Sequence, residues 1–350
     1  MARYLDEIME EARKAVGVSR PNPPVGAIIA RDGVVIGRGH TQKVGGAHAE
    51  IMALRDAGEK ARGAELYVSL EPCCHYGLTP PCTSAIIDAG IAFVCYAHGD
   101  MNPVVRGKSR KILEDAGIRV VCLEEEFPVE AGRFNDFYRA YDYFVRNGKT
   151  FVELKIAMTS DGFIAGEDRL RMKITDSAAD ADVQALRASA DAILVSGATL
   201  DADDPLLTTR DIPGGNSPQR IVFSGKRILS PDRQIFHSGL RPIVYSEVAQ
   251  PGLKDLADVR ILPGESFTEN WQTVLDALSR GGMHRLLVEP GAALAECVLQ
   301  TKLWNRLDLW VAPWAAGKGF PGSLSVWNLL KAGEKATEER FKGWGKFDND

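Results

Sequence analysis

Two short motifs decide how this chain is interpreted: AHAE at residues 47–50 and LEPCCHYGLTPPC at residues 70–82. They combine a histidine, a glutamate two residues after it, and two well-separated cysteines. One imidazole and two thiolates make three zinc ligands, which is typical of a catalytic site because a fourth tetrahedral position stays open. We therefore predict that His48, Cys73 and Cys82 bind one Zn²⁺ per chain. Glu50 need not be a ligand and suits a catalytic proton shuttle.

The spacing of the cysteines leaves competing interpretations. The usual zinc-deaminase pattern has a second cysteine three residues after the first, but Tyr76 occupies that position. Cys74 is adjacent to Cys73 and is poorly placed to reach the same ion. His75 is the nearest competing ligand, although we expect it to line the substrate pocket instead. The alternative is that these are unrelated buried residues, since free cysteine is often buried.

Length and composition exclude several classes of protein. A chain of 350 residues favours two domains, and a net charge of −5 argues against a nucleic acid as the main partner. Six cysteines, three of them in one short stretch, indicate a metal site in a reducing compartment rather than a disulfide framework. The acidic start of the chain does not resemble a signal peptide, and no apolar run is long enough to span a membrane. We expect a cytoplasmic protein.

The first half of the chain alternates helical and strand patterns in the order αββαβαβαβ, which is typical of a three-layer α/β domain. Both motifs then fall at helix N-termini that follow strands, where the helix dipole favours a thiolate. Asn22 precedes the first expected strand, so its amide is a candidate contact for a bound base or ribose. A turn between prolines explains this asparagine equally well.

An aromatic-rich amphipathic helix over residues 128–146 is followed by the break Asn147-Gly148-Lys149. We place domains at residues 1–147 and 148–335, with a polar tail at 336–350. The second domain is predicted to be another α/β unit, whose last clear strand covers 307–312. Small-residue turns follow the buried strands that end at Val195 and Val288. Such turns beyond the carboxyl ends of strands suit a ligand.

Taken together, the motifs resemble the bifunctional riboflavin-biosynthesis family, diaminohydroxyphosphoribosylaminopyrimidine deaminase fused to 5-amino-6-(5-phosphoribosylamino)uracil reductase. The resemblance covers roughly residues 1–325 and rests on PNPPVG at 21–26, the two motifs above, and Asp100 with Asn102. It implies a cytidine-deaminase-like zinc domain followed by a dihydrofolate-reductase-like α/β domain that uses NADPH. It also implies that His48, Cys73 and Cys82 hold zinc while Glu50 moves protons.

The resemblance also implies roles in the second half. It places NADPH near Ala157, Thr199, Asp203 and Gly291. It places the phosphoribosyl substrate near Arg187, Leu207, Arg210 and Glu289. The planar fork of arginine matches phosphate oxygens, although a single arginine is also a common surface charge.

Several positions depart from the family pattern. They are Leu78 in the first half, and Phe163, Lys173, Ser224, Gly225 and Pro290 in the second. Proline at 290 matters most because it has no N–H to offer a phosphate. An alternative is therefore a diverged paralogue with a working deaminase and an inactive or repurposed reductase half.

The expected reactions are zinc-dependent hydrolytic deamination of 2,5-diamino-6-(5-phosphoribosylamino)pyrimidin-4-one, then NADPH-dependent reduction of the ribose to a ribityl chain. A tRNA-adenosine editor would instead have the shorter cysteine spacing and a basic surface. A non-enzymatic zinc module would have a fourth protein ligand. The aromatic helix at 128–146 suggests an interface, and we expect a homo-oligomer, either a dimer or a tetramer.

Overall fold

The computed structural model describes residues 2–168, 172–332 and 344–348. The chain forms two compact units. The first contains Met1–Lys149 together with the short segment Ile212–Asn216, and the second contains Thr150–Asp211 and Ser217–Asp350.

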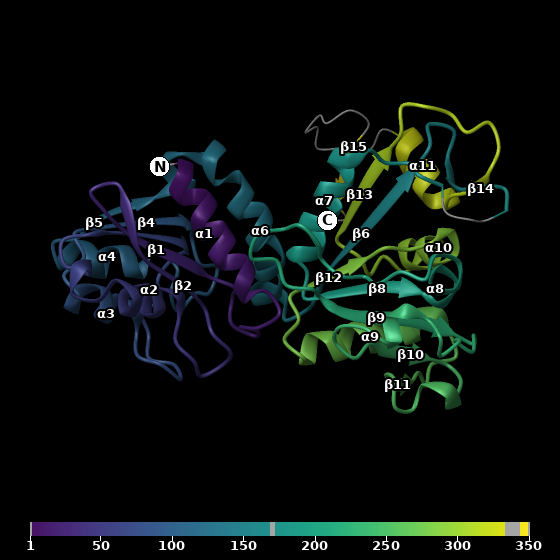
Figure 1. Cartoon of the computed structure of the whole chain (residues 1–350), viewed down its shortest axis with the longest axis horizontal. Helices are drawn as coiled ribbons and strands as arrows, with labels where there is room; N and C mark the ends of the chain where they lie inside the picture. Colours follow the sequence, from purple (N-terminus) through teal and green to yellow (C-terminus); the bar gives the residue numbers. More distant parts are fainter. Residues whose placement is uncertain (1, 169–171, 333–343, 349–350) are drawn as a thin grey trace. The chain divides into compact units, whose positions relative to one another are not determined.

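The first unit is built on a five-stranded sheet in the order β2-β1-β3-β4-β5 (Figure 1). Strand β1 pairs antiparallel with both β2 and β3, whereas β3, β4 and β5 run parallel. The strands are β1 Gly26–Arg31, β2 Val34–His40, β3 Glu65–Leu70, β4 Phe93–His98 and β5 Arg119–Cys122. The helices are α1 Ala2–Ala15, α2 Ala49–Ala57, α3 Cys82–Asp88, α4 Lys108–Asp115, α5 Leu123–Glu126 and α6 Pro128–Asn147, with a 3₁₀ turn at Gly58–Ala61. The α/β order predicted from the sequence is confirmed.

Glycines on β2 allow α2 to lie unusually close to the sheet. A Cβ atom on Gly39 would stand 2.3 Å from the carbonyl oxygen of Ala49, and one on Gly37 would stand 2.4 Å from that of Ala53. The facing side of α2 is correspondingly small, since Ala49 and Ala53 are fully buried. This close packing fixes the N-terminus of α2, where the AHAE motif lies.

Helix α6 packs its aromatic side chains into the core of the first unit. Phe134 and Tyr138 are fully buried, and Tyr141 is nearly so. The Tyr138 hydroxyl donates to the carbonyl of Pro24 at 2.8 Å and is 2.6 Å from the hydroxyl of Ser69 on β3. These rings therefore anchor α6 within its own unit.

The second unit contains an eight-stranded sheet in the order β11-β10-β9-β8-β12-β6-β13-β15 (Figure 1). Every neighbouring pair in it is parallel except β13 with β15. The strands are β6 Phe151–Met158, β8 Ala192–Ser196, β9 Gln219–Gly225, β10 Ile243–Ser246, β11 Asp258–Ile261, β12 Arg285–Val288, β13 Arg306–Val311 and β15 Trp344–Asp348. A separate small ladder joins β7 Phe163–Ala165 to β14 Phe320–Pro321. The helices are α7 Ser177–Ala188, α8 Gly197–Asp203, α9 Phe267–Arg280, α10 Ala292–Thr301 and α11 Leu324–Ala332, with 3₁₀ turns at Gln234–Phe236 and Pro251–Leu253.

The C-terminal region differs from the expected polar tail. The sequence predicts 307–312 as the last clear strand and a polar tail over 336–350. The structure has helix α11 at Leu324–Ala332 and strand β15 at Trp344–Asp348, which pairs antiparallel with β13 along its length. An unpaired edge on β13 would leave its backbone groups without ladder partners. Strand β15 supplies these hydrogen-bond partners, although its segment is too short and too polar to be recognised as a strand from the sequence alone.

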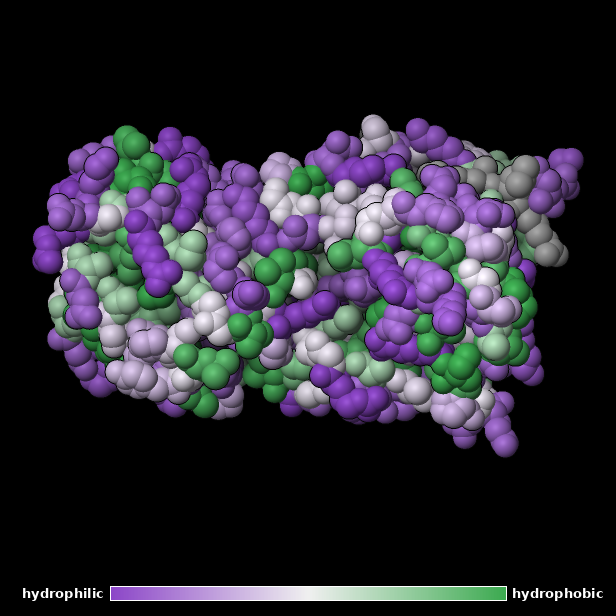
Figure 2. All heavy atoms as spheres, turned by 60° about the horizontal axis from the view of Figure 1, so that its bottom comes forward, coloured by the Kyte–Doolittle hydropathy of each residue, from purple (hydrophilic) through white to green (hydrophobic). Residues whose placement is uncertain are grey.

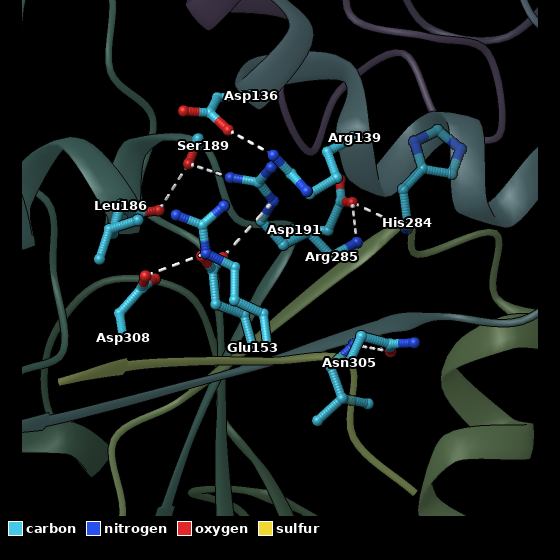
Figure 3. A network of polar contacts seen from close by, with 12 residues as sticks. Asp136, Arg139, Glu153, Leu186, Ser189, Asp191, His284, Arg285, Asn305 and Asp308 are labelled. Atoms are coloured by element: carbon cyan, nitrogen blue, oxygen red, sulfur yellow. Dashed lines mark hydrogen bonds and ion pairs between the residues drawn. The ribbon is translucent and has the colours of Figure 1, made fainter. Parts of the chain in front are cut away.

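A buried charge cluster ties together the amino ends of three central strands (Figure 3). Nε of Arg306 lies 2.9 Å from Oδ1 of Asp308 and 3.4 Å from Oε1 of Glu153. Arg285 at the start of β12 faces Glu153 at 3.8 Å, and burial holds the pKa of Asp308 well above its ordinary value. The cluster occupies the amino edge of the sheet, so its charges serve the fold and leave the carboxyl edge for a ligand.

The face drawn in Figure 2 is mostly hydrophilic, with apolar residues in small groups among the polar ones. Across the ranges that the structure describes, no helix combines the length and hydropathy needed to cross a membrane.

Candidate functional sites

The three predicted zinc ligands come together in the first unit. Nδ1 of His48 lies 3.4 Å from Sγ of Cys73 and 3.3 Å from Sγ of Cys82. All three donor atoms lie within 4.8 Å of one another. His48 immediately precedes α2 and Cys82 is the first residue of α3, so two helix N-termini deliver two of the ligands. Cys73 comes from the loop after β3.

This arrangement fits a zinc ion. Tetrahedral Zn–S and Zn–N bonds of about 2.3 and 2.0 Å separate sulfur from nitrogen by roughly 3.5 Å, close to the distances found here. The Cys73 sulfur accepts a hydrogen bond from the backbone N–H of Cys82 at 3.3 Å. Hydrogen bonds from Cys82 and His48 lower the pKa of Cys73 below its ordinary value, which favours the thiolate form that binds zinc. Of the competing donors, the Cys74 thiol is directed to the carbonyl of Val104 at 3.7 Å instead.

Glu50 lies beside the ligands on the first turn of α2, 3% exposed. Burial raises the pKa of its carboxyl to about 7, and the charge of Cys73 adds to this rise. A group with such a pKa both accepts and returns a proton near neutrality. The position suits a proton shuttle, as the sequence predicts.

A cavity of about 490 Å³ opens onto this group. His48, Glu50 and Cys73 line it, and so do Asn22 and His75, the two residues expected to contact the substrate. This volume is typical of a site for a small molecule. The first unit thus gathers two of the predicted ligands, the predicted shuttle and both predicted contacts around one space, and the third ligand, Cys82, lies buried beside them.

The cavity also contains residues that the sequence did not mark as site residues. They include Thr41 after β2, Glu71, Asp100 after β4, and Tyr141 on α6. Burial raises the pKa of Asp100 to about 6, although its Oδ1 accepts from the Tyr141 hydroxyl at 3.2 Å. The family-like Asp-x-Asn pattern was the available signal for Asp100. For Thr41 and Tyr141 there was none, because a loop threonine and a helix tyrosine acquire this position only through tertiary packing.

Glu71 holds the loop that carries Asp100. Its Oε2 accepts hydrogen bonds from the backbone N–H of Gly107 at 3.0 Å and of Asp100 at 3.4 Å, and its Oε1 accepts from the Ser109 hydroxyl. The carboxylate therefore pins both ends of the segment 100–107 beside the cavity.

In the second unit, the predicted cofactor residues lie at the carboxyl edge of the sheet. Ala157 is near the end of β6, Thr199 is on the helix after β8, and Gly291 caps α10 after β12. These three strands are adjacent and parallel, so their carboxyl ends share one edge, where ligands bind in open α/β sheets. A Cβ atom on Gly291 would stand only 3.3 Å from Oγ1 of Thr199. Because Gly291 has no side chain, the space between it and Thr199 stays open, and this space fits a bound nucleotide. Asp203, the fourth of these residues, is exposed at the far end of α8.

Two of the four predicted substrate residues of this unit contact each other, and the other two lie outside that pair. Arg187 on α7 and Glu289 after β12 form a bidentate pair with distances of 2.7 and 2.8 Å. The arginine fork is therefore engaged by a carboxylate, and its Nη1 also donates to the carbonyl of Thr208 at 3.4 Å. Leu207 is packed in a hydrophobic core and is 2% exposed, so its neighbours cover it almost completely. Arg210 is exposed, and its N–H donates to Gln184 at 2.8 Å.

The departures from the family pattern in the second half leave the Arg187–Glu289 pair and the close approach of Gly291 to Thr199 in place. The Ser224 hydroxyl donates to the carbonyl of Tyr245 at 3.3 Å, so it is used within the sheet. Gly225 has a φ of 58°, where glycine is favoured. Phe163 lies on β7 and Lys173 is exposed. Pro290 separates Glu289 from Gly291, yet the Arg187–Glu289 pair and the Gly291 cradle are both formed.

Comparison with known proteins supports both halves. Residues 2–98 match the cytidine and deoxycytidylate deaminase zinc-binding region, and residues 150–349 match the RibD C-terminal domain. The chain is 41% identical over 306 residues to the riboflavin biosynthesis protein RibD of Synechocystis, covering 86% of this chain and 81% of that protein. It is 34% identical to RibD of Aquifex aeolicus, covering 96% and 94%.

A solved structure from Thermotoga maritima, a diaminohydroxyphosphoribosylaminopyrimidine deaminase/5-amino-6-(5-phosphoribosylamino)uracil reductase, matches over 99% of this chain and 98% of its own. The identity is 30% and the TM-score is 0.73. The zinc-site geometry, the matched domains and relatives of this coverage agree, and the chain belongs to the RibD family of riboflavin-biosynthesis proteins.

Proposed function

We propose that the first unit deaminates 2,5-diamino-6-(5-phosphoribosylamino)pyrimidin-4-one and that the second unit then reduces the ribose to a ribityl chain with NADPH. The observation that carries the proposal is the cluster of His48, Cys73 and Cys82 beside a cavity that Glu50 also lines. The RibD C-terminal domain follows in the same chain, and we assign the reduction to it.

In the deamination, His48, Cys73 and Cys82 hold the zinc ion. When bound, zinc acts as a Lewis acid that makes a coordinated water acidic near neutral pH. Glu50 accepts a proton at its carboxylate and returns it to the departing ammonia, a role that its buried place beside the zinc ligands allows. Asn22 and His75 orient the ring from the cavity wall.

In the reduction, Ala157, Thr199, Asp203 and Gly291 hold NADPH, which supplies a hydride when bound. Glu289 contacts the phosphoribosyl group, and Arg187 orients Glu289 through the bidentate pair. Arg210 is exposed and offers its guanidinium to the phosphate.

A diverged paralogue is the second candidate, because Phe163, Lys173, Ser224, Gly225 and Pro290 depart from the family pattern at the reductase site. In that protein the deaminase works and the second unit is inactive or serves another pyrimidine-derived pathway.

One experiment separates the two candidates. The zinc-loaded protein is incubated with the aminopyrimidine phosphate, and ammonia release and NADPH oxidation are followed together. The bifunctional enzyme releases ammonia first and then oxidises one NADPH per ammonia. Ammonia without NADPH oxidation favours the paralogue. Glu50→Gln is the control: it should keep its zinc and lose roughly 10²- to 10⁴-fold in deamination rate.

We also propose a homo-oligomer, a dimer or tetramer, and a cytoplasmic location. All six cysteines are free, which suits a reducing compartment. Light scattering of the purified protein measures the oligomeric state directly.

A further inference from the structure

His98 is a buried histidine at the end of β4 whose two ring nitrogens both face oxygen atoms. Its Nε2 lies 2.9 Å from Oδ2 of Asp142 on α6. Its Nδ1 lies 2.9 Å from Oδ1 of Asn135, which is also on α6, and 3.3 Å from Oε2 of Glu124 on α5. A neutral imidazole has one N–H to donate, whereas the imidazolium has two. A carboxylate at each nitrogen therefore favours the charged form of this ring.

The surroundings of His98 make its charge depend on pH above the ordinary range. Burial lowers the pKa of the ring, but hydrogen bonding and charge from Asp142, together with the charge of Glu124, raise it above its usual value of 6.5. From α6 the Asn135 amide and the ring of Tyr138 also face it, and the two ring centroids are 5.4 Å apart. A histidine whose pKa is raised by folding contributes a stabilisation that is complete below pH 6.5 and is lost as pH rises through the folded pKa.

The His98 ring joins two elements that form one wall of the deaminase cavity. Asp100 follows two residues after His98, and Tyr141 directly precedes Asp142 on α6. Asp100 and Tyr141 both line the cavity, and the Tyr141 hydroxyl donates to Oδ1 of Asp100 at 3.2 Å. Loss of the His98 charge weakens the tie between α6 and the end of β4, so the contact between Tyr141 and Asp100 loses its support.

We propose that His98 is a positioning residue of the deaminase site: its imidazolium holds α6 and the Asp100 loop in the arrangement that binds the aminopyrimidine, and binding weakens when the ring loses its proton. The inference rests on the proposed function, since it concerns the substrate of the same cavity. In the part of the chain that the structure describes, His98 is not one of the residues that line the cavity. It acts through Tyr141 and Asp100, which are.

The test compares nucleotide binding with and without the titrating ring. The parent is the zinc-loaded Glu50→Gln protein, in which turnover is suppressed, and calorimetry measures its affinity for the aminopyrimidine phosphoribosyl nucleotide between pH 6 and pH 9. His98→Gln, added to this parent, keeps a hydrogen-bonding side chain that does not titrate. The parent should bind about 3- to 10-fold more tightly than His98→Gln at the low end, the range for one hydrogen bond in the wall. The ratio of the two affinities should fall to one as pH rises. His237→Gln, which removes an exposed histidine of the second unit, is the matched control and should follow the parent.

A second variant keeps the histidine and changes only its surroundings. Asp142→Asn removes one carboxylate, so the pKa of His98 should fall. NMR of the His98 ring measures that pKa, and the pH at which nucleotide affinity is lost should move down with it.

Three results would overturn the proposal. The first is an affinity ratio near one between the parent and His98→Gln at every pH. The second is a shift of the NMR midpoint in Asp142→Asn without a shift in the pH dependence of binding. The third is a lower melting temperature in His98→Gln with unchanged affinity, because His98 would then support the fold alone.

Failure of this inference can be told apart from failure of the proposed function. Absence of ammonia release from the wild type, or of nucleotide binding by the parent at every pH, would overturn the proposed deamination and this inference with it. An affinity ratio that does not change with pH, in a protein that binds the nucleotide, bears on His98 alone.

Discussion

Arg187 and Glu289 illustrate how two residues expected to contact the same substrate also contact each other. The bidentate pair is mostly buried, with the two side chains 13% and 17% exposed. Arg187 comes from α7 and Glu289 from the loop after β12, so the pair exists only once both elements are packed. At the scale of single residues, Arg187 therefore acts as a positioning residue for Glu289.

Arg187→Lys should lower kcat/KM of the reduction roughly 10- to 100-fold, the equivalent of losing about 1.5–3 kcal/mol of charge-assisted hydrogen bonding. The charge is retained, but an ammonium group cannot reproduce the two-pronged contact. NADPH oxidation is measured with the deaminated substrate. Ammonia release in the same preparation is the control and should not change. Equal losses in both reactions would indicate general damage and would contradict the assigned role.

At the scale of elements, the contact between α2 and β2 sets the zinc site. Gly37 and Gly39 bring the helix so close that its N-terminus presents His48 and Glu50 to Cys73 and Cys82. The sequence contains these glycines, yet nothing local distinguishes them from flexible-loop glycines. Their role depends on which helix the sheet meets.

Gly39→Ala should destabilise the first unit by roughly 1–3 kcal/mol, because the new Cβ would meet the backbone oxygen of Ala49 at 2.3 Å. Urea unfolding measures the change, and zinc affinity should fall with it. Gly132→Ala on α6 is the matched control. A Cβ there meets no atom within 4 Å, so alanine should be neutral or stabilise by up to about 1 kcal/mol. Comparable losses in both variants would refute the close-packing argument.

Helix α11 is held at its N-terminus by Glu296 on α10. The carboxylate accepts from the hydroxyls of Ser325 at 2.6 Å and Ser323 at 2.7 Å, and from the N–H of Ser325 at 3.0 Å. Hydrogen bonding, chiefly from Ser325, lowers the pKa of Glu296 from 4.5 to about 2. A depressed carboxyl pKa gives a stabilisation that is complete above the unfolded value and is lost as pH falls through the folded one.

The stability difference between the wild type and Glu296→Gln should therefore be largest above pH 4.5 and shrink as pH approaches 2. Denaturant unfolding of both proteins at several pH values tests this. The wild type alone should show the pH-dependent contribution, since glutamine does not titrate. A difference that stays constant from pH 7 to pH 3 would show that the carboxylate charge is not what holds α11.

At the scale of the whole molecule, the two sets of site residues belong to separate compact units. Every predicted zinc ligand lies in Met1–Lys149, and every predicted NADPH residue lies in the second unit. Each unit also has its own hydrophobic core. The two chemistries can therefore be removed one at a time.

Zinc chelation should abolish ammonia release, and added Zn²⁺ should restore it. Oxidation of NADPH with substrate that is already deaminated should continue at the original rate, because all three predicted zinc ligands lie in the first unit. Atomic absorption verifies that the metal has been removed. Parallel loss of NADPH oxidation would show that the second reaction depends on the metal as well.

The sequence by itself predicted three zinc ligands and a proton shuttle, and it determined the alternation of helices and strands. These depend on residue type and short spacing: thiolates, an imidazole and a carboxylate in two motifs, and hydrophobic periods along each element. The turns after Val195 and Val288, at the carboxyl edge of the sheet, could also be predicted, because they too depend on residue type and short spacing.

The tertiary structure alone decided which distant residues share a site. It turned Thr41 and Tyr141 toward the cavity of the first unit, joined Arg187 to Glu289, buried Leu207, and paired β15 with β13. Each depends on contacts between segments far apart in the chain, where the free energy comes from burial and from satisfying backbone groups. A local sequence pattern does not identify a contact partner far away in the chain. These features could therefore be found only in the folded structure.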